Sequence, residues 1–463
     1  MRDSRKKISA IIVALIVIMC FFTTNSGAQG SKIIEIYTAS DLMKIGNNPD
    51  WPLDRHYLLM NDLVFEENSV SNFTMIAPEM NNPFTGIFDG NNHTIKGLTR
   101  KAENEAIALF GYVGLYKMKE GVVKNLGLVD ISLEGERVAT LANSLRNGII
   151  ENCYSTGNIS GTEMVGGIVA TSTGGIIKKC YSICSINGKR LAGGIAAINA
   201  GSSTILKCYY KGNIFSQRTD PKMSSICAGG IVGDNYAKLE KSYFHGEIFV
   251  NSDNLYPPML IPRATGGIVG SNYQDGLVEN CYSIGKVTGP DILGGIIGEN
   301  YGEVRKCYSA CELYLRYMQG ENSIGGIAGS SIGSVRGNVA LNPKVHVYYA
   351  SYGNMGGRIA GDVLGSTQKG VEINANIYSN YAWSGMEINL STNLRYTETP
   401  VGEYLRNGLS KSYEELTDIR AYIELGWSFD GDNPVWEFSG EYKLPKLVGV
   451  GGQEDLVSPS HLM

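Results

Sequence analysis

Cysteine and histidine are the first residues whose spacing could do chemistry in this chain of 463 residues. Two cysteine pairs, Cys180–Cys184 and Cys307–Cys311, are four residues apart, which is ~13 Å in a strand and too far for a disulfide. No Cys-x-x-Cys pair occurs and the five histidines are scattered, so we expect no zinc site. Five cysteines instead recur in the phrase Cys-Tyr-Ser or a close variant, and we interpret them as a ladder of small core residues: Cys153, Cys180, Cys208, Cys281 and Cys307.

Carboxylates are the second candidates, because acid–base catalysis needs them gathered on one face. Asp234, Asp275 and Glu299 occupy comparable turns after a Gly-Gly-Ile phrase, whereas other acidic residues such as Asp291 and Glu303 are spread out. A carboxylate row in one groove is one interpretation, and ordinary polar turns are the other, which we favour. We therefore predict no catalytic residue, no metal and no cofactor.

Tyrosine is the third candidate, because it directly follows the repeated cysteine. If the cysteine points inward, the alternation of a strand turns this tyrosine outward. A stacked aromatic strip either binds sugar rings or stabilises the sheet through its neighbours, and we favour the second interpretation. The candidate ligand-binding residues are Tyr154, Tyr181, Tyr282 and Tyr308, with Tyr209 and Tyr243 at the same position. A second set, Tyr236, Tyr273 and Tyr301, lies in the turn after Gly-Gly-Ile and is expected to extend that surface.

The elements that carry these residues come from a repeat. Gly-Gly pairs begin at Gly166, Gly193, Gly229, Gly266, Gly294, Gly325 and Gly356, with spacings of 27, 36, 37, 28, 31 and 31 residues. The clearest unit, 266–289, contains three short apolar runs bounded by turn residues and no 3.6-residue period. This is typical of one coil of a β-solenoid. We predict an all-β, right-handed parallel β-helix whose paired glycines lie where the backbone packs too tightly for a Cβ.

The repeat divides the chain into five segments. Residues 1–28 read as a signal peptide, 29–104 as an N-terminal cap with the first strands, and 105–395 as the repeats. Residues 396–448 are expected to form an aromatic C-terminal cap over the last open edge, and 449–463 a flexible tail. Short helices are expected at 38–46 and 412–425. Two insertions, 216–225 and 251–262, are expected to form outward loops that carry specificity.

The first residues predict export. A basic start precedes the apolar run 8–22, and Ser26-Gly27-Ala28 offers a cleavage site before Gln29. A membrane anchor is one alternative, and a lipoprotein anchored at Cys20 is another. Cleavage leaves 36 basic and 44 acidic residues, a net charge of −8. This balance argues against nucleic acid as a partner.

Three motifs together resemble the GLUG-motif family of bacterial, Bacteroidetes-type secreted and surface proteins. They are the repeated GGIVG…NCYS, the segment PFTGIFDGNNHTIKGL at 83–98, and LGWSFDGDNPVW…YKLPKL between 425 and 447. The resemblance implies a surface-exposed β-solenoid without a defined ligand. Related repeats occur in adhesins and in the non-catalytic part of immunoglobulin A1-cleaving zinc metallopeptidases. The His-Glu-x-x-His motif of those peptidases is absent from this sequence.

These observations favour a non-catalytic secreted or cell-surface protein that works in adhesion or ligand binding, with a glycan or a host protein as partner. A polysaccharide-acting β-helix enzyme is the first alternative, and a purely structural assembly module is the second.

Overall fold

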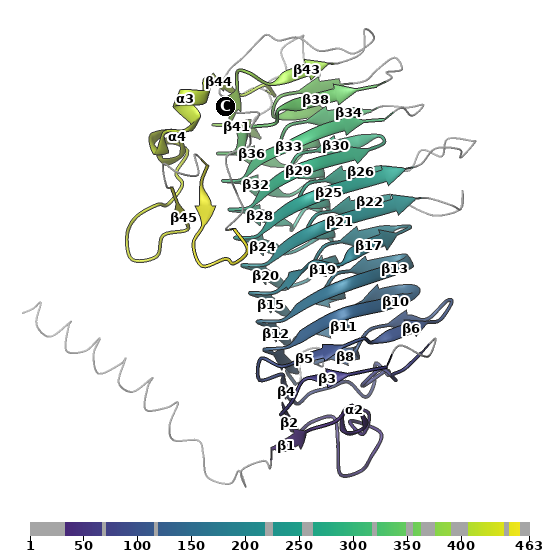
Figure 1. Cartoon of the computed structure of the whole chain (residues 1–463). Helices are drawn as coiled ribbons and strands as arrows, with labels where there is room; N and C mark the ends of the chain where they lie inside the picture. Colours follow the sequence, from purple (N-terminus) through teal and green to yellow (C-terminus); the bar gives the residue numbers. More distant parts are fainter. Residues whose placement is uncertain are drawn as a thin grey trace, which may run out of the picture.

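A computed structural model describes residues 33–66, 71–114, 119–217, 226–251, 263–316, 322–348, 355–362, 376–389, 406–438 and 444–453. The predicted signal peptide with Cys20, most of both predicted insertions and residues 454–463 lie outside these ranges. Within them, no helix is long and apolar enough to cross a membrane. The described chain winds into a rod of stacked coils with parallel sheets along its sides, which confirms the predicted parallel β-solenoid (Figure 1).

The first face of the rod is a sheet of twelve parallel strands. In the coils that carry the repeated Cys-Tyr phrase, each strand of this sheet ends two residues before the cysteine, where the chain turns. In order they are β1 (Ile34–Ile36), β2 (His56–Leu59), β4 (Ile87–Asp89), β9 (Val122–Lys124), β12 (Ile149–Glu151), β15 (Ile176–Lys178), β20 (Thr204–Leu206), β24 (Lys238–Glu240), β28 (Leu277–Glu279), β32 (Glu303–Arg305), β36 (Ser334–Arg336) and β41 (Ile377–Tyr378).

The second face holds the longest strands, which begin at the repeated tyrosine and end at the Gly-Gly corner. Those of the lower coils are β3 (Leu63–Val64), β5 (Thr94–Lys96), β6 (Thr99–Lys101), β7 (Ala106–Ile107), β10 (Gly127–Ala139), β13 (Tyr154–Gly166), β16 (Tyr181–Ser182), β17 (Ser185–Gly188) and β18 (Leu191–Gly193). Those of the upper coils are β21 (Tyr209–Gln217), β22 (Ile226–Gly229), β25 (Tyr243–Asn251), β26 (Arg263–Gly266), β29 (Tyr282–Gly289), β30 (Ile292–Gly294), β33 (Tyr308–Leu315), β34 (Ser323–Gly325), β37 (Val339–Ala340), β38 (Lys344–Val347), β39 (Met355–Gly357), β42 (Tyr381–Trp383), β43 (Glu387–Asn389) and β44 (Leu409–Lys411).

The third face is a sheet of nine strands that follow the Gly-Gly corner. They are β8 (Phe110–Val113), β11 (Ala142–Arg146), β14 (Val169–Thr173), β19 (Ala196–Ala200), β23 (Val232–Asn235), β27 (Val269–Asn272), β31 (Ile297–Asn300), β35 (Ala328–Ser331) and β40 (Ala360–Asp362). Register is kept from coil to coil on all three faces, with Ile150 paired to Ile177, Tyr154 to Tyr181 and Val169 to Ala196. Identical repeat positions therefore stack along the rod.

The interior is filled by these stacked positions. The predicted cysteine ladder is buried, and its thiols are free, as are all eight cysteines in the described part of the chain. A second ladder was not foreseen. Asn199, Asn235, Asn272 and Asn300, the asparagine ladder, are fully buried and joined side chain to side chain by Nδ2–H···Oδ1 hydrogen bonds of 2.8 Å. Each amide donates to the next one along the rod, so the Oδ1 atoms of Asn235, Asn272 and Asn300 are satisfied inside the core, as buried polar groups require. The Oδ1 of Asn199, at the lower end, has no partner in the described part of the chain.

The Gly-Gly corners show why these positions exclude a side chain. A Cβ on Gly266 would lie 2.0 Å from the carbonyl oxygen of Val269, and one on Gly267 would lie 2.1 Å from that of Gly295. Both neighbours are backbone atoms, so neither contact is relieved by a side-chain rotation. The predicted close approach of the backbone is therefore present.

The N-terminal segment is part of the rod. The sheet of the first face begins at β1, and β4 pairs with β9 without a break at residue 105, where the boundary of the repeats was expected. The expected helix at 38–46 is short, α2 (Ala39–Leu42), and it begins at Thr38, whose side chain and that of Asp41 form a capping box.

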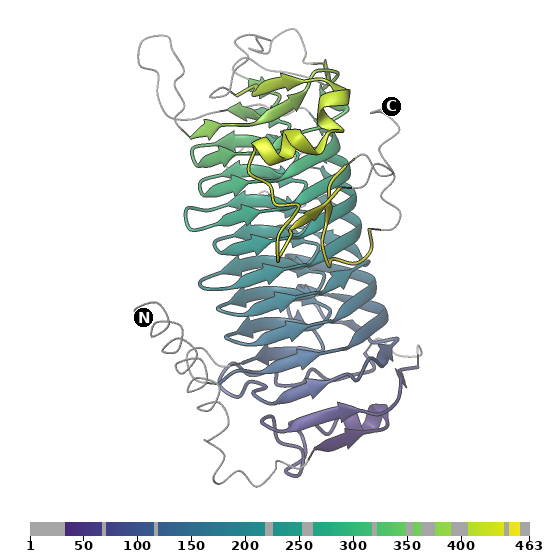
Figure 2. The ribbon, with the colours of Figure 1, turned by 90° about the vertical axis from the view of Figure 1, so that its left-hand side faces the viewer.

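The C-terminal end differs from the prediction in two respects. The single helix expected at 412–425 is two helices, α3 (Tyr413–Leu416) and α4 (Ile419–Glu424), because Asp418 caps the second one by accepting from the backbone N–H of Arg420. Two antiparallel strands follow, β45 (Trp436–Glu437) and β46 (Lys446–Leu447). We call described residues 412–453 the C-terminal module. It lies along the flank of the rod, beside its upper coils, and does not sit on its end (Figures 1 and 2).

Candidate functional site

The repeated tyrosines form one continuous stack at the start of the second face. This tyrosine column consists of Tyr154, Tyr181, Tyr209, Tyr243, Tyr282 and Tyr308, which the register places directly above one another. Neighbouring ring centroids are 4.7 to 5.0 Å apart, and the ring planes differ by 1 to 7°. All four tyrosines proposed from the sequence as ligand-binding residues thus belong to one structure.

Stacking decides which part of each ring faces outward. Because the planes are nearly parallel and one coil apart, each ring covers the faces of its neighbours. At the lower end, Tyr154 lies over Gly127, where a Cβ would come within 2.5 Å of the ring atom Cζ. The column therefore presents ring edges and phenol hydroxyls to its surroundings. The covered ring faces leave no room for a sugar ring to stack on them, so the stacking itself serves the sheet, and only ring edges and hydroxyls remain for contact with a ligand.

The C-terminal module covers the upper half of the column. Tyr282 is 0% and Tyr308 1% exposed, and both rings contact Trp436 at centroid distances of 6.3 and 6.0 Å. The Tyr308 hydroxyl donates to the carbonyl of Pro445 at 3.0 Å, and Trp436 donates its Nε1–H to Asn280 at 3.1 Å. The placement of Tyr282 and Tyr308 among ligand-binding residues is therefore corrected, because the chain's own C-terminal residues occupy that surface.

The expectation of a loose tail from Gly449 is corrected for the same reason. Gln453 is buried, and its side-chain amide donates to the carbonyls of Leu447 and Val450 at 2.8 Å. The Tyr243 hydroxyl donates to the carbonyl of Gly451 at 3.0 Å. Residues 449–453 are thus held against the column by specific hydrogen bonds.

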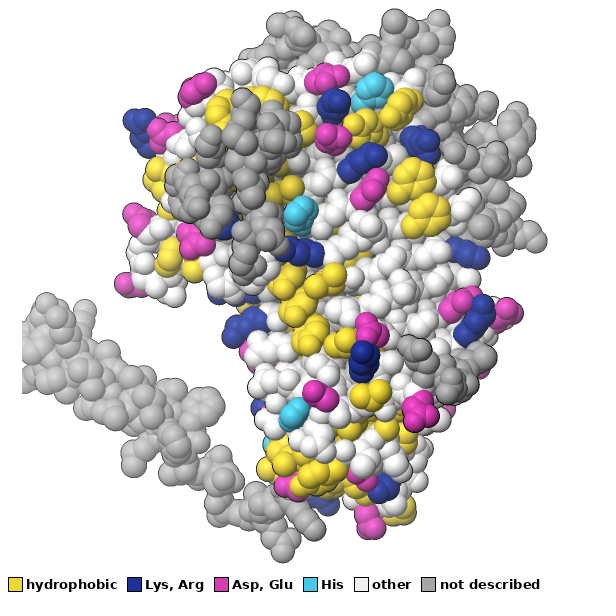
Figure 3. All heavy atoms as spheres, in the orientation of Figure 1, with side chains coloured by type: hydrophobic (Ala, Val, Ile, Leu, Met, Phe, Trp, Pro, Cys, Tyr) yellow, Lys and Arg dark blue, Asp and Glu magenta, His cyan; other side chains and the backbone are white. Residues whose placement is uncertain are grey.

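The lower part of the column is open. Tyr154 and Tyr181 are half-buried, and in the described part of the chain their hydroxyls make no hydrogen bond. Tyr209 marks the border, because a Cβ on Gly452 would lie 2.8 Å from its ring. Hydrophobic side chains gather on the middle of this side of the rod, below the module (Figure 3). The open part is the accessible remainder of the predicted strip.

A row of lysines beside the column was missed by the sequence analysis. Lys179, Lys207 and Lys241 directly precede the cysteine-ladder position in three successive coils, at the corner between the first and second faces. Each has a left-handed backbone, with φ of 54, 55 and 48°. Asparagine, which tolerates this conformation well, occupies the same corner at Asn125, Asn152 and Asn280. The signal in the sequence was the change from Asn-Cys-Tyr to Lys-Cys-Tyr or, at Lys241, Lys-Ser-Tyr.

The second tyrosine set lies on the opposite side of the Gly-Gly corner. Tyr236 and Tyr273 stack at 4.0 Å with planes 7° apart, and Tyr301 follows at 6.0 Å. They follow strands of the third face, whereas the tyrosine column begins the second face. The expectation that this set extends the surface of the column is therefore wrong.

Two of the three comparable carboxylates share one row. The register of the third face aligns Asp234, Ser271 and Glu299, whereas Asp275 lies in the exposed turn that follows. Burial raises the pKa of Asp234 to about 6, and burial likewise raises the pKa of Glu299, which accepts a hydrogen bond from Tyr301. Asp234 is 6% exposed, and one of its carboxyl oxygens has no hydrogen-bond partner in the described part of the chain. Such buried groups are poorly placed to reach a polymer substrate.

The described residues contain no group of three or more His, Cys, Asp or Glu side chains that is arranged to hold a metal ion. The cysteine thiols point into the core, and burial raises the pKa of Cys281 well above its usual range. A buried thiol whose pKa is raised in this way stays protonated and is a poor nucleophile.

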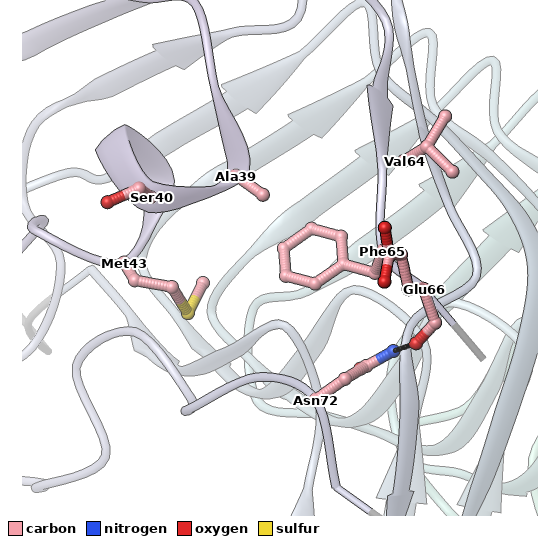
Figure 4. A pocket seen from close by; sticks show the side chains of 7 residues that line it. All are labelled: Ala39, Ser40, Met43, Val64, Phe65, Glu66 and Asn72. Atoms are coloured by element: carbon pink, nitrogen blue, oxygen red, sulfur yellow. Dashed lines mark hydrogen bonds between the residues drawn. The ribbon is translucent and has the colours of Figure 1, made fainter. Parts of the chain in front are cut away.

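A shallow hollow of about 470 Å³ lies at the N-terminal end of the rod, between α2 and β3. Met43 and Phe65 line its floor, and Asn72 donates to the backbone carbonyl of Glu66 at its rim (Figure 4). No residue of this hollow was singled out from the sequence. Glu66 is the one acidic or basic residue among those that line it.

Comparison with known proteins supplies the family motif. The model of the GLUG motif matches residues 262–288. The chain carries the GLUG motif. Over 139 residues, 29% of its length, it is 31% identical to halomucin of Haloquadratum walsbyi, and it spans 2% of that protein.

Two solved structures resemble this GLUG-motif chain. An IgA1 protease matches 90% of this chain and 26% of its own, with 15% identity and a TM-score of 0.41. A putative immunoglobulin A1 protease from Bacteroides ovatus matches 91% and 93% of the two chains, with 16% identity and a TM-score of 0.32.

Proposed function

We propose that this chain is an exported, non-catalytic β-solenoid that binds an extracellular ligand, a glycan or a host protein, through the flank of the rod. The open part of the tyrosine column carries the proposal. Tyr154 and Tyr181 present hydroxyls without hydrogen-bond partners in the described part of the chain, on a patch that the C-terminal module leaves uncovered. Tyrosines with one apolar side and one free polar end are enriched at binding surfaces.

Export is part of the proposal and rests on the basic start, apolar run and cleavage pattern of residues 1–28. Cell fractionation followed by mass spectrometry of the mature N-terminus tests it. A chain beginning at Gln29 in the extracellular or surface fraction supports export through a signal peptide. A lipid-modified N-terminus at Cys20 supports the lipoprotein alternative, and an uncleaved cytoplasmic chain contradicts both.

Ligand binding is tested with the mature protein on a glycan and host-protein array. The double variant Tyr154→Phe/Tyr181→Phe removes two hydroxyls and keeps the stack intact, so folding is preserved. With ~1 kcal/mol for each lost hydrogen bond, binding is expected to fall on the order of tenfold. Tyr348→Phe is the matched control, because Tyr348 is 50% exposed and lies outside the column.

Two results contradict the proposal. Absence of binding by the wild-type protein across the array favours the purely structural role. Release of reducing ends or unsaturated products from a polysaccharide panel demonstrates an enzyme, and loss of that activity in Asp234→Asn would assign it to the buried carboxylate row.

A further inference from the structure

The lysine row is an unusual arrangement of charge. Lys179, Lys207 and Lys241 stand in successive coils of one parallel sheet corner, so their Cα atoms are ~4.8 Å apart along the rod. The neighbouring coils of the same corner carry asparagine, which the backbone there prefers. The lysines therefore replace a residue that suits the conformation better, and local folding offers no reason for three cations in line.

The row lacks matching anions. Lys207 and Lys241 form no ion pair in the described part of the chain, and Lys179 lies 3.8 Å from Glu151, whose carboxylate also pairs with Lys178 at 2.9 Å. Partial burial lowers the pKa of Lys207, and the charges of Lys241 and Lys179 lower it further. This direction is expected where ammonium groups repel one another without a counter-charge.

The tyrosine edges add to the same electrostatic character. An aromatic ring is positive at its edge and negative on its face, and the column turns its edges and hydroxyl donors outward. Lys179 and the open rings of Tyr181 and Tyr154 thus line one corner with hydrogen-bond donors and positive charge. Lys207 and Lys241 continue the row upward along the edge of the C-terminal module, where Gly449 lies beside the Lys207 ammonium group. In a chain of net charge −5 this corner is locally basic.

We propose that this corner binds a linear acidic polysaccharide, lying along the rod with its carboxylate or sulfate groups on Lys179, Lys207 and Lys241. The inference rests on the proposed function and names the ligand class for the same flank. The spacing favours a polysaccharide over other polyanions, because one coil is close to the length of one pyranose unit in an extended chain. Because neighbouring sugar units are rotated about the chain axis, the long lysine side chains are needed to reach the anions that face the rod.

The test compares the mature wild-type protein with the triple variant Lys179→Asn/Lys207→Asn/Lys241→Asn. Asparagine already occupies this corner in the coils of Asn152 and Asn280, so the variant is expected to fold and to keep its melting temperature. Lys306→Asn is the matched control, since Lys306 has the same position and φ of 54° at the upper end of the rod.

Binding is measured to polygalacturonate, to dextran sulfate, to neutral dextran, to poly-glutamate and to duplex DNA, each at low and high salt. We expect the acidic polysaccharides to bind, binding to weaken with salt, and the triple variant to lose on the order of tenfold in affinity while Lys306→Asn loses none. The two acidic polymers distinguish carboxylate from sulfate recognition.

Three outcomes overturn the inference. Equal binding of the acidic polysaccharides by the wild type and the triple variant would show that the lysine row does not bind them. Stronger binding of poly-glutamate or DNA than of either acidic polysaccharide assigns the row to another polyanion. The protein could instead bind a neutral glycan or another protein, with binding that is weakened by substitution of Tyr154 and Tyr181 and unchanged in the lysine variant. That result contradicts this inference and still supports the proposed function.

Discussion

The hydroxyl of Tyr282 donates a hydrogen bond of 2.8 Å to Oε1 of Gln453, a residue 171 positions further along the chain. The same Oε1 accepts from the backbone N–H of Leu447 at 2.9 Å. One buried side-chain amide thus joins the repeat to the end of the described chain. This contact explains why the column is half covered, and why its accessible part is restricted to the coils of Tyr154, Tyr181 and Tyr209.

Trp436→Ala is expected to loosen the C-terminal module. Trp436 is fully buried between the column and Trp427, and removing such a side chain costs about 3–5 kcal/mol. Hydrogen exchange of residues 444–453 should accelerate, and proteases should cut the module while the rod stays intact. Glu437→Ala is the control, because Glu437 is the exposed neighbour on the same strand. Unchanged exchange in Trp436→Ala would mean that the module is held by other contacts.

The rod was predictable because its determinants are periodic. Cys180, Gly229 and Tyr181 each have equivalents in other units, and a period of this size leaves few folds available. The site was less predictable because its determinants occur once. Gln453 reaches Tyr282 from outside the repeat, and no local pattern in the sequence indicates a contact over that separation. Lysine at the corner of Lys207 looked like ordinary surface variation until the register placed it between two other lysines.

The asparagine ladder is expected to be a major source of stability, and Asn272→Ala tests it. Asn272 accepts from Asn235 and donates to Asn300, so its removal leaves a buried donor and a buried acceptor unpaired. The expected loss is about 2–4 kcal/mol in the free energy of unfolding, measured by denaturant titration. Asn158→Ala, at an exposed position of β13, should lie within about 0.5 kcal/mol of wild type. Equal stability of the two variants would show that water replaces the lost amide.

A methyl group at a Gly-Gly corner is expected to be poorly tolerated. In Gly266→Ala the new Cβ meets a backbone carbonyl at 2.0 Å, so the corner itself must shift. Overpacking of this kind costs about 1–3 kcal/mol, which should lower the melting temperature clearly. Gly451→Ala is the control, because the nearest atom to its Cβ would be Tyr209 Cε1 at an ordinary 3.7 Å. A wild-type melting temperature for Gly266→Ala would contradict the close approach of the backbone at this corner.

The buried carboxyl of Asp234 makes stability depend on pH in a direction opposite to that of paired surface carboxylates. It faces the Cys227 thiol, with Arg190 lowering and Glu299 raising its pKa, and burial sets the folded value at about 6 against 3.8 when unfolded. The folded state then holds the Asp234 proton more tightly than the unfolded state does. The contribution of this carboxyl to the free energy of unfolding is therefore fully present below about pH 4 and is lost as the pH rises through 6. The difference between the folded and unfolded pKa values of Asp234 corresponds to about 3 kcal/mol in the free energy of unfolding. Asp234→Asn should remove it, so the variant should gain stability over wild type at pH 7.5 and show no such gain at pH 4. Denaturant midpoints of both proteins across this range measure the effect, and parallel pH profiles would show that Asp234 is ionised at neutral pH without penalty.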